Sequence, residues 1–457
     1  MTIVRRSASS LPKSISRLVA ACLVAAGLAL GGCTESQRPE ATGKGTIRGM
    51  HAVSTAADVT FLIEENSLGN LSYKNASQAQ EFDDLTYNFN FDTRKPGTTS
   101  LSRIATETVT IVPEMDYVFV LTGTIASPSV LLWETEERQW EGDETTFEVS
   151  AGHLSPGSGP LDVYFVETGT APAAGNARDT LSFGERLAPF EVEAGEYQVI
   201  VTTEGDPASI LFTSTSRDYA ERTSVLFTIQ DADPSITTPL SVRRIDQNGS
   251  SAELGDPAFR PTRRFFNAAF GSGSMDVYLE DDFAAPIVSN LAHAAVSADV
   301  PVPAGARTFT FTAAGNPGAI LLEDDDTVVS NTRGTHFVTG EPDDLDTSVL
   351  TDDRRPVTGL GKIRFNQMSA GFELVDLYFV APGTDLAETS PNLSRVAAAS
   401  RGYIHLDPGT YELTVTRTGE KTVLAGPLAV DLTSGGILEA TIVDTEDPNR
   451  LNLVVYE

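Results

Sequence analysis

Apolar and polar positions alternate along this chain in short stretches, and one such stretch occurs four times. The segments ADVTFL, LDVYFV, MDVYL and VDLYFV begin at residues 57, 161, 275 and 375. In each of them an aspartate stands between the first two apolar positions, and apolar residues recur at every second place. A period of two is typical of a strand with one buried face. The chain is therefore predicted to contain four copies of one β module.

Two further blocks follow this strand in the same order. A turn with glycine precedes alternating apolar residues near 195, 305 and 409, and we match residues 113–121 of the first copy to this block. Pro-Gly pairs favour such turns. A proline followed by aliphatic residues recurs at 128–133, 207–212 and 317–322, while residues 423–424 hold this place in the fourth copy. This alignment puts Trp133 in a core and makes residues 70–99 an insert of the first copy.

Helical periodicity is nearly absent, and short strands separated by Gly and Pro turns predict an all-β protein. We expect tandem antiparallel β-sandwich modules of the immunoglobulin or transthyretin-like kind. About 100 residues suffice for one core. The expected modules cover residues 46–140, 141–262 with a linker, 263–360 with a linker, and 361–457. Interfaces between modules could create a site that no single module has.

Residues 1–32 are predicted to be a secretory signal peptide. Four basic residues and no acidic residue accompany an apolar run at 18–30. That run is shorter than the ~20 residues needed to cross a bilayer, although an uncleaved anchor is the alternative. Leu30-Gly31-Gly32-Cys33 resembles the lipobox of bacterial lipoproteins, which implies cleavage before Cys33, lipid on its sulfur and attachment to the membrane. Residues 33–45 then form a lipidated tether.

The composition narrows the choice of partners. The net charge is −31, and it becomes −35 once residues 1–32 are removed with their four basic side chains. Such a chain is not expected to bind nucleic acid or to dock electrostatically on anionic lipid. Cys22 leaves with the signal and Cys33 is lipidated, so no disulfide is expected.

A family resemblance agrees with this prediction. Met50-His51-Ala52 leading into residue 57, and turns such as Val302-Pro303-Ala304-Gly305, resemble a repeated domain of unknown function found in bacterial envelope lipoproteins. The third and fourth copies have Asn267-Ala268 and Asn366-Gln367 in place of His-Ala. The resemblance implies a location in the cell envelope, and Thr34 after the lipidated cysteine favours the outer membrane if the source is Gram-negative. It implies no activity.

The repeated aspartates are the first candidates for chemistry: Asp58, Asp162, Asp276 and Asp376. A catalytic carboxylate needs a partner close by and a shifted pKa. A catalytic site is also expected in one module rather than in all four. We therefore expect these aspartates to cap the N–H groups of a neighbouring loop, and we predict no catalytic residue.

Metal binding has little support in the sequence. The five histidines form no pair with zinc-ligand spacing. Asp324, Asp325 and Asp326 are weak calcium candidates that lack the spacing of an EF-hand loop, and a solvated hairpin is the favoured alternative. No metal or cofactor is predicted. Nucleophile elbows and phosphate-binding loops are absent from the sequence.

The leading hypothesis is a non-catalytic, lipid-anchored envelope protein that acts as a surface spacer or binding array. An envelope glycan, a matrix polymer or an envelope protein is the expected partner. Tyr164, Tyr278 and Tyr378 could line a sheet face for sugars, or could lie under a second layer. The alternatives are an enzyme or enzyme accessory acting on envelope polysaccharide, and a calcium-stiffened rod.

Overall fold

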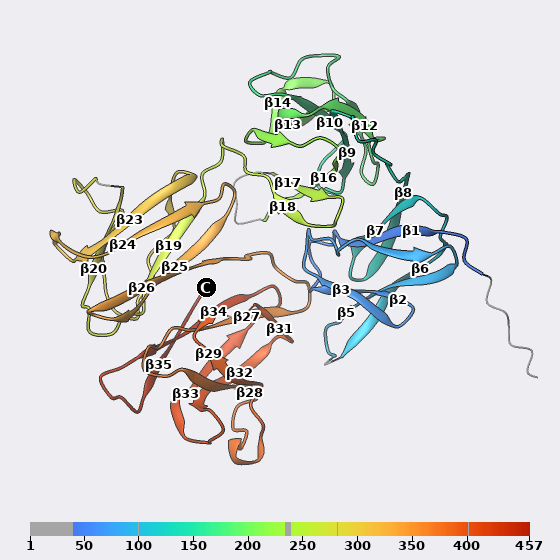
Figure 1. The fold of residues 1–457 in the computed structure, drawn as a ribbon. Coiled ribbons are helices and arrows are strands. Elements are labelled where there is room, and N and C mark those ends of the chain that lie inside the picture. Colours follow the sequence, from blue (N-terminus) through green and yellow to red (C-terminus); the bar gives the residue numbers. More distant parts are fainter. Residues whose placement is uncertain (1–39, 99, 234–238, 281, 401) are drawn as a thin grey trace, which may run out of the picture.

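The part of the protein that the structure describes is all-β and is built from eight sheets. The computed structural model describes residues 40–98, 100–233, 239–280, 282–400 and 402–457. Apart from the 3-10 helix η1 (Leu386–Glu388), the regular elements of these residues are strands. Consecutive sheets enclose a shared apolar core, so the described chain forms four two-sheet modules (Figure 1). The predicted tandem β-sandwich class is confirmed.

Modules 1 and 2 each consist of two sheets. One sheet of module 1 contains β4 (Gln80–Asp83), β1 (Lys44–His51), β7 (Met115–Thr124) and β8 (Ser127–Glu136). The other contains β3 (Asn66–Leu71), β2 (Val59–Ile63), β5 (Thr86–Arg94) and β6 (Leu101–Thr110). The first sheet of module 2 contains β12 (Phe190–Glu193), β9 (Thr146–His153), β16 (Ser224–Asp231), β17 (Leu240–Asp246) and β18 (Ser251–Glu253). The second sheet there contains β11 (Asp179–Leu181), β10 (Leu161–Glu167), β13 (Gly195–Thr203), β14 (Asp206–Thr213) and β15 (Arg217–Tyr219).

Modules 3 and 4 repeat this plan. The first sheet of module 3 contains β22 (Val300–Pro301), β19 (Thr262–Asn267), β25 (Arg333–Glu341) and β26 (Asp344–Thr351). Its second contains β21 (Val288–Leu291), β20 (Met275–Leu279), β23 (Gly305–Ala313) and β24 (Asn316–Val328). The first sheet of module 4 contains β30 (Ala399–Ser400), β31 (Ile404–Leu406), β27 (Gly361–Gln367), β34 (Ile437–Asp444) and β35 (Leu451–Tyr456). Its second contains β29 (Leu393–Ala397), β28 (Leu374–Val380), β32 (Gly409–Arg417) and β33 (Val423–Leu432).

Each module contains one pairing that differs from the antiparallel expectation. The first strand of the module runs parallel to a strand near its end, in the pairs β1–β7, β9–β16, β19–β25 and β27–β34. Parallel neighbours need a long crossover. Here the strands of the second sheet supply it, and the sequence pattern of single strands carries no sign of this pairing.

The alignment of the first copy was wrong in two blocks. Residues 113–121 and 128–133 lie mainly in β7 and β8, which pair as β16–β17 do in module 2. The counterparts of β13 and β14 are instead β5 and β6, so the supposed insert at 70–99 contains regular strands of the sandwich. The error arose because β5 begins without the Gly turn that marks its counterparts.

The strands of the parallel pair are buried on both faces of their sheet. All seven residues of β27 are buried, as are the last seven of β1. One face lies on the module's own core, and the other packs against the adjacent module. An apolar cluster of Met50, Val120, Leu154, Leu226 and Ile245, among others, joins modules 1 and 2, and a second cluster of Phe266, Phe337, Met368 and Val443 joins modules 3 and 4.

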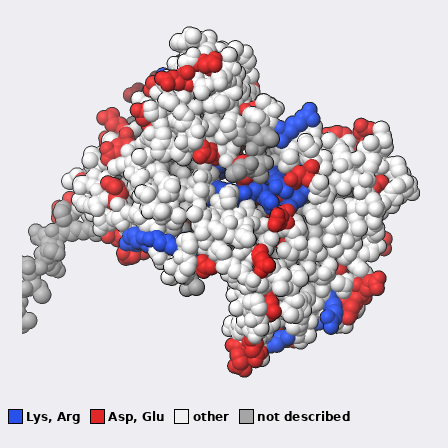
Figure 2. All heavy atoms as spheres, turned by 180° about the vertical axis from the view of Figure 1, so that it is seen from behind, with Lys and Arg blue, Asp and Glu red and all other residues white. Residues whose placement is uncertain are grey.

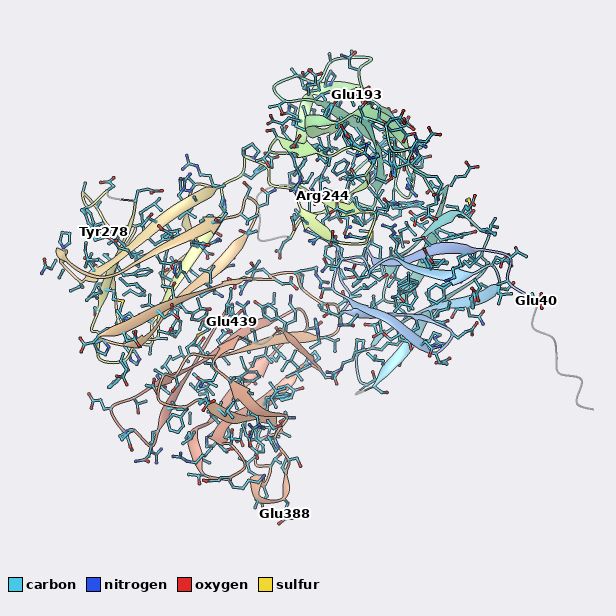
Figure 3. All side chains as sticks on the ribbon, in the orientation of Figure 1. Glu40, Glu193, Arg244, Tyr278, Glu388 and Glu439 are labelled. Atoms are coloured by element: carbon cyan, nitrogen blue, oxygen red, sulfur yellow. The ribbon has the colours of Figure 1, made fainter. Side chains whose placement is uncertain are left out.

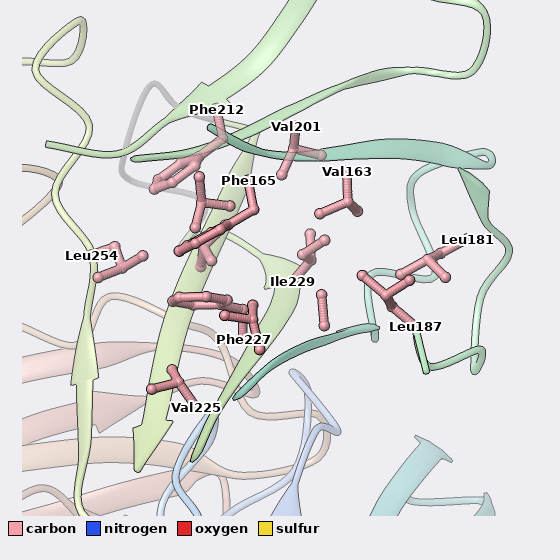
Figure 4. Close-up of a cluster of buried hydrophobic side chains, with 14 of the residues drawn as sticks. Val163, Phe165, Leu181, Leu187, Val201, Phe212, Val225, Phe227, Ile229 and Leu254 are labelled. Atoms are coloured by element: carbon pink, nitrogen blue, oxygen red, sulfur yellow. The ribbon is translucent and has the colours of Figure 1, made fainter. Parts of the chain in front are cut away.

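The module cores are dense in aromatic and branched side chains. Figure 4 shows module 2, where Phe165, Phe212 and Phe227 meet between the sheets. Full burial of such a side chain stabilises the fold by about 1.5–3 kcal/mol. Trp133 is also buried, but it lies in the cluster between modules 1 and 2 rather than in a sandwich core.

Candidate functional site

The four modules meet at a central pocket of about 420 Å³. Module 1 contributes the turn after β3, module 2 the strands β17 and β18, module 3 the ends of β24 to β26, and module 4 the start of β31 with the residues before it. Its lining consists of Asp58, Ser72, Tyr73, Lys74, Asn75, Asp233, Arg243, Glu253, Asn331, Thr332, Arg333, Thr351, Asp352, Asp353, Arg355, Gly402, Tyr403 and His405. The pocket therefore exists only in the assembled chain.

Basic side chains gather in this centre although the chain as a whole is strongly acidic. Figure 2 shows Lys and Arg in the central hollow, with Asp and Glu scattered over the periphery. Lys74 Nζ lies 3.6 Å from Glu253, and Arg243 lies 3.7 Å from the other oxygen of that carboxylate. Arg355 similarly lies 3.6 Å from Asp353. Charges of both signs thus balance locally.

Burial shapes the ionisation of the lining. It lowers the pKa of Lys74, against the opposing effect of Glu253, and it lowers the pKa of Arg243 for the same reason. It also lowers the pKa of His405 to about 4, with Lys362 and Arg355 adding to the effect. His405 is therefore neutral at pH 7 and can both donate and accept a hydrogen bond.

A buried ionic network lies beneath the pocket and joins modules 3 and 4. Arg364 donates to Glu439 over 2.8 Å and also pairs with Asp352 at the end of module 3. Arg264 approaches Asp352 within 3.3 Å. Glu439 is fully buried, and Figure 3 places it on the side of module 4 that faces module 3. Removing one partner of such a network leaves an uncompensated buried charge.

Three of the four repeated aspartates cap turns. Asp162 accepts a hydrogen bond from Gly205 N at 2.8 Å, Asp276 from Gly315 N at 2.8 Å, and Asp376 from Gly419 N at 2.9 Å. The second oxygen accepts from Thr180, Asn290 N and Arg395 N respectively. These glycines lie in the hairpin turns β13–β14, β23–β24 and β32–β33.

Asp58 has a different environment. The hairpin that it would cap is replaced by the longer loop after β5, where Gly97 N donates to Asp407 of module 4. The carboxyl of Asp58 instead lies in the central pocket, with Ser72 as its hydrogen-bond partner. Burial raises its pKa, while Ser72 and Arg355 oppose the shift. The first repeat thus turns a capping position into a pocket residue.

The histidines of the first strands hold loops in place. The ring of His51 accepts from Val53 N at 3.3 Å and lies 3.2 Å from Ala57 O. His153, Asn267 and Gln367 occupy the same place at the ends of β9, β19 and β27 and bridge the same two kinds of groups. The sequence comparison found only part of this equivalence, because His, Asn and Gln share hydrogen-bonding geometry rather than a motif.

The three aspartates considered as calcium ligands each contact a different residue of the protein. Asp324 lies 3.2 Å from His336, Asp325 accepts from Thr308 at 2.6 Å, and Asp326 lies 3.2 Å from Arg263. They stand in β24, where successive side chains point to opposite faces. Within the described part of the chain, no three His, Cys, Asp or Glu side chains are grouped so that they could hold a metal ion.

The tyrosines considered as a sugar platform are covered. Tyr164 and Tyr378 are each 1% exposed, and Tyr278 is 3% exposed. Lys421 lies over the ring of Tyr378, and Phe283 contacts Tyr278. Of the two interpretations left open by the sequence, the structure agrees with the second packed layer.

The central site was not found by sequence reasoning. Arg355 follows Asp352 and Asp353 in a stretch that looked like an acidic linker, and Asn331 lies in a turn without any motif. The run of two arginines before Pro356 was the one available signal. The predicted signal peptide, residues 1–32, and the lipidation site Cys33 lie outside the described residues. In the described ranges no helix is long and apolar enough to span a membrane.

The fold and the pocket define a multi-module β-sandwich protein with a site shared between its modules. The family described as "Domain of unknown function (DUF4397)" matches residues 45–164 and 262–378, more than half of the chain, and the protein belongs to this family. Each match covers one module and continues into the second strand of the next.

Other comparisons add little. No curated protein matches this chain. The solved structure described as "The Bacillus anthracis TIE protein" aligns over 89% of this chain and 69% of its own, at 8% identity. Its TM-score of 0.16 is too low to indicate a common arrangement.

Proposed function

We propose that this protein is a non-catalytic, lipid-anchored protein of the cell envelope that binds an envelope component at the junction of its four modules. All four modules would be copies of the family domain. The signal-like residues 1–32 and the lipobox-like sequence ending at Cys33 support export and anchoring. Attachment to the membrane would then leave the folded modules free on a short tether.

The observation that carries the binding role is the shared pocket. A spacer of independent modules needs no contact between distant copies, whereas here modules 1 and 4 meet directly. Arg94 of module 1 pairs with Asp407 of module 4 at 3.0 Å, and Arg355 in the linker between modules 3 and 4 donates to Ser54 O and Ala56 O at 2.6 Å. These contacts hold one polar pocket between all four modules. The proposed partner is an envelope glycan, a matrix polymer or an envelope protein.

A non-catalytic role is favoured over an enzyme of polysaccharide because of how the pocket carboxylates are engaged. Glycoside hydrolysis needs two carboxyl groups of opposite roles. Asp58 has a raised pKa, but Glu253, Asp352 and Asp353 are each held in ion pairs with Lys or Arg. Their place in these pairs indicates a structural role.

Anchoring and exposure can be tested in cells that carry a C-terminal tag on the protein. We expect the wild type to fractionate with membranes and Cys33→Ser to appear in the soluble fraction. Protease added to intact cells would remove the tag if the modules face outward, and a periplasmic control must survive. Equal fractionation of the wild type and Cys33→Ser would contradict lipid anchoring. Turnover of an envelope polymer that is abolished by Asp58→Asn would favour the enzyme instead.

A further inference from the structure

The central pocket contains hydrogen-bonding groups that the protein itself does not use. Asn331 is 3% exposed, and neither its side-chain oxygen nor its nitrogen has a hydrogen-bond partner among the described residues. Nε2 of His405 is also buried and unpartnered within the described chain. An unmet buried polar group costs about 1–3 kcal/mol. A ligand that supplies partners recovers this cost.

The backbone presents Asn331 in a special conformation. Its φ of 60° lies in the left-handed region, which asparagine tolerates better than most residues. The turn in which it lies connects β24 to β25, at the point where module 3 meets the pocket. Glycine would accept this conformation without burying an unmet amide, so the backbone alone does not explain an asparagine here.

The four cations that line the pocket are each engaged in an ion pair with a carboxylate of the protein. Lys74 and Arg243 share Glu253, Arg355 contacts Asp353, and Arg333 pairs with Asp299 at 2.9 Å. The chain around the pocket is strongly acidic, with a total of −31, which repels anions at long range. The unused capacity therefore lies in two neutral groups, the amide of Asn331 and the imidazole of His405.

Size and lining indicate the class of ligand. A volume of about 420 Å³ is within the range of small-molecule sites. Amide, hydroxyl and charged groups line it together with Tyr73 and Tyr403; Arg355 lies over the ring of Tyr73, and Lys362 and Arg364 lie over the ring of Tyr403. Such a set of neighbouring donors and acceptors suits a molecule with many hydroxyl groups.

We propose that the central pocket binds a neutral saccharide of one or two rings, with hydroxyl groups bonded to Asn331 and His405. This inference rests on the proposed function and narrows its partner to a neutral glycan. All four modules hold the ligand in place, so binding also stabilises the assembled arrangement.

The test is a titration of the lipidated protein, purified in a detergent without a sugar headgroup. Glucose, galactose, N-acetylglucosamine and their disaccharides are titrated one by one, followed by saturation-transfer NMR and calorimetry, with glucuronic acid and inorganic phosphate as charged probes. We expect at least one neutral saccharide to bind and to raise the melting temperature. No binding by any neutral sugar, or stronger binding of the charged probes, overturns the proposal.

Two matched variants locate the site. Asn331→Gly removes the amide but accepts the left-handed backbone, and it should weaken binding about tenfold or more, the effect of losing one well-placed hydrogen bond. Asn290→Gly changes an exposed asparagine with φ 51° outside the pocket and should bind as the wild type does. Equal affinity of the two variants overturns the assignment of the site. Membrane fractionation and crosslinking to envelope material that persist without sugar binding would leave the proposed function standing and remove only the saccharide.

Discussion

The indole of Trp133 in module 1 lies directly over Gly152 in module 2. A Cβ on Gly152 would come within 2.2 Å of the indole carbon Cη2, and Trp133 Nε1 donates to Gly184 O at 3.0 Å. One module thus inserts its tryptophan into a space that a glycine of the next leaves open. The contact fixes the two modules relative to each other, and it belongs to the same set of interfaces that shapes the central pocket.

Gly152→Val should therefore disrupt the interface between modules 1 and 2. Overpacking of this kind costs about 1–3 kcal/mol. Urea unfolding measures the loss, and Gly142→Ala, at an open position, serves as a control that should stay within about 0.5 kcal/mol. Combining Gly152→Val with Trp133→Leu should recover part of the stability. If the losses in unfolding free energy of the two single variants simply add in the double variant, the contact between Trp133 and Gly152 does not stabilise the interface.

His51→Gln should be tolerated, because glutamine holds the equivalent place at Gln367. His51→Leu leaves Val53 N and Ala57 O without partners and should cost about 1–3 kcal/mol. Thermal and urea unfolding compare the variants. A loss in His51→Gln as large as that in His51→Leu would contradict the bridging role.

The same residue predicts a pH dependence. Burial lowers the pKa of His51 to about 3, with Arg355 adding to the shift, so the folded ring stays neutral while the unfolded ring takes up a proton near pH 6.5. The histidine's contribution is complete above pH 6.5 and is lost as the pH falls toward 3, at about 1.4 kcal/mol per unit. The free energy of unfolding of His51→Gln should fall less steeply between pH 6 and 4. Parallel curves for variant and wild type would refute this.

Substitution by asparagine should have opposite effects on stability at the capping aspartates and at Asp58. Asp376 accepts from two backbone N–H groups, one on each oxygen, and Asp376→Asn replaces one of these acceptors by an NH2 donor, which should cost about 1–3 kcal/mol. Asp58 carries a raised pKa, so its ionised form weakens folding at neutral pH. Asp58→Asn should be neutral or slightly stabilising. Comparable losses in urea unfolding would contradict the different environments of the two residues.

Glu439→Gln should be among the most damaging single changes. It leaves Arg364, which donates to this carboxylate over 2.8 Å, with reduced compensation in a buried site. Breaking such a pair costs about 3–5 kcal/mol. Glu420→Gln, at an exposed pair with Arg417 at 3.9 Å, is the matched control and should change stability little. A small effect of Glu439→Gln on the melting temperature would mean that this carboxylate is not needed to compensate the buried charge of Arg364.

Calcium should not stabilise the protein through residues 324–326. Each of these carboxylates already has its own partner, His336, Thr308 or Arg263. Differential scanning fluorimetry in millimolar Ca²⁺, with Mg²⁺ as the control ion, should show no shift. A rise of several degrees that is specific to Ca²⁺ would restore the stiffened-rod hypothesis.

The sequence predicted which segments form strands and which face of each strand is buried, but it did not predict which strands pair with one another. The period of two around Asp162, Asp276 and Asp376 predicted strands with the correct buried face, because alternation is a property of neighbouring residues. The same pattern could not tell that β7 follows β6 into the other sheet, so residues 113–121 were matched to the wrong strand. Register and sheet membership depend on residues more than 60 positions away, such as Thr46 opposite Asp116.

By itself the sequence determined an all-β chain of repeated strands, because short-range alternation and turn residues fix the backbone locally. Only the tertiary structure decided that Asp58 leaves its capping role, that Trp133 belongs to an interface, and that Lys74, Asn331, Arg355 and His405 surround one pocket. These residues are up to 331 positions apart in the chain. They come together through the packing of whole modules, which no local pattern encodes.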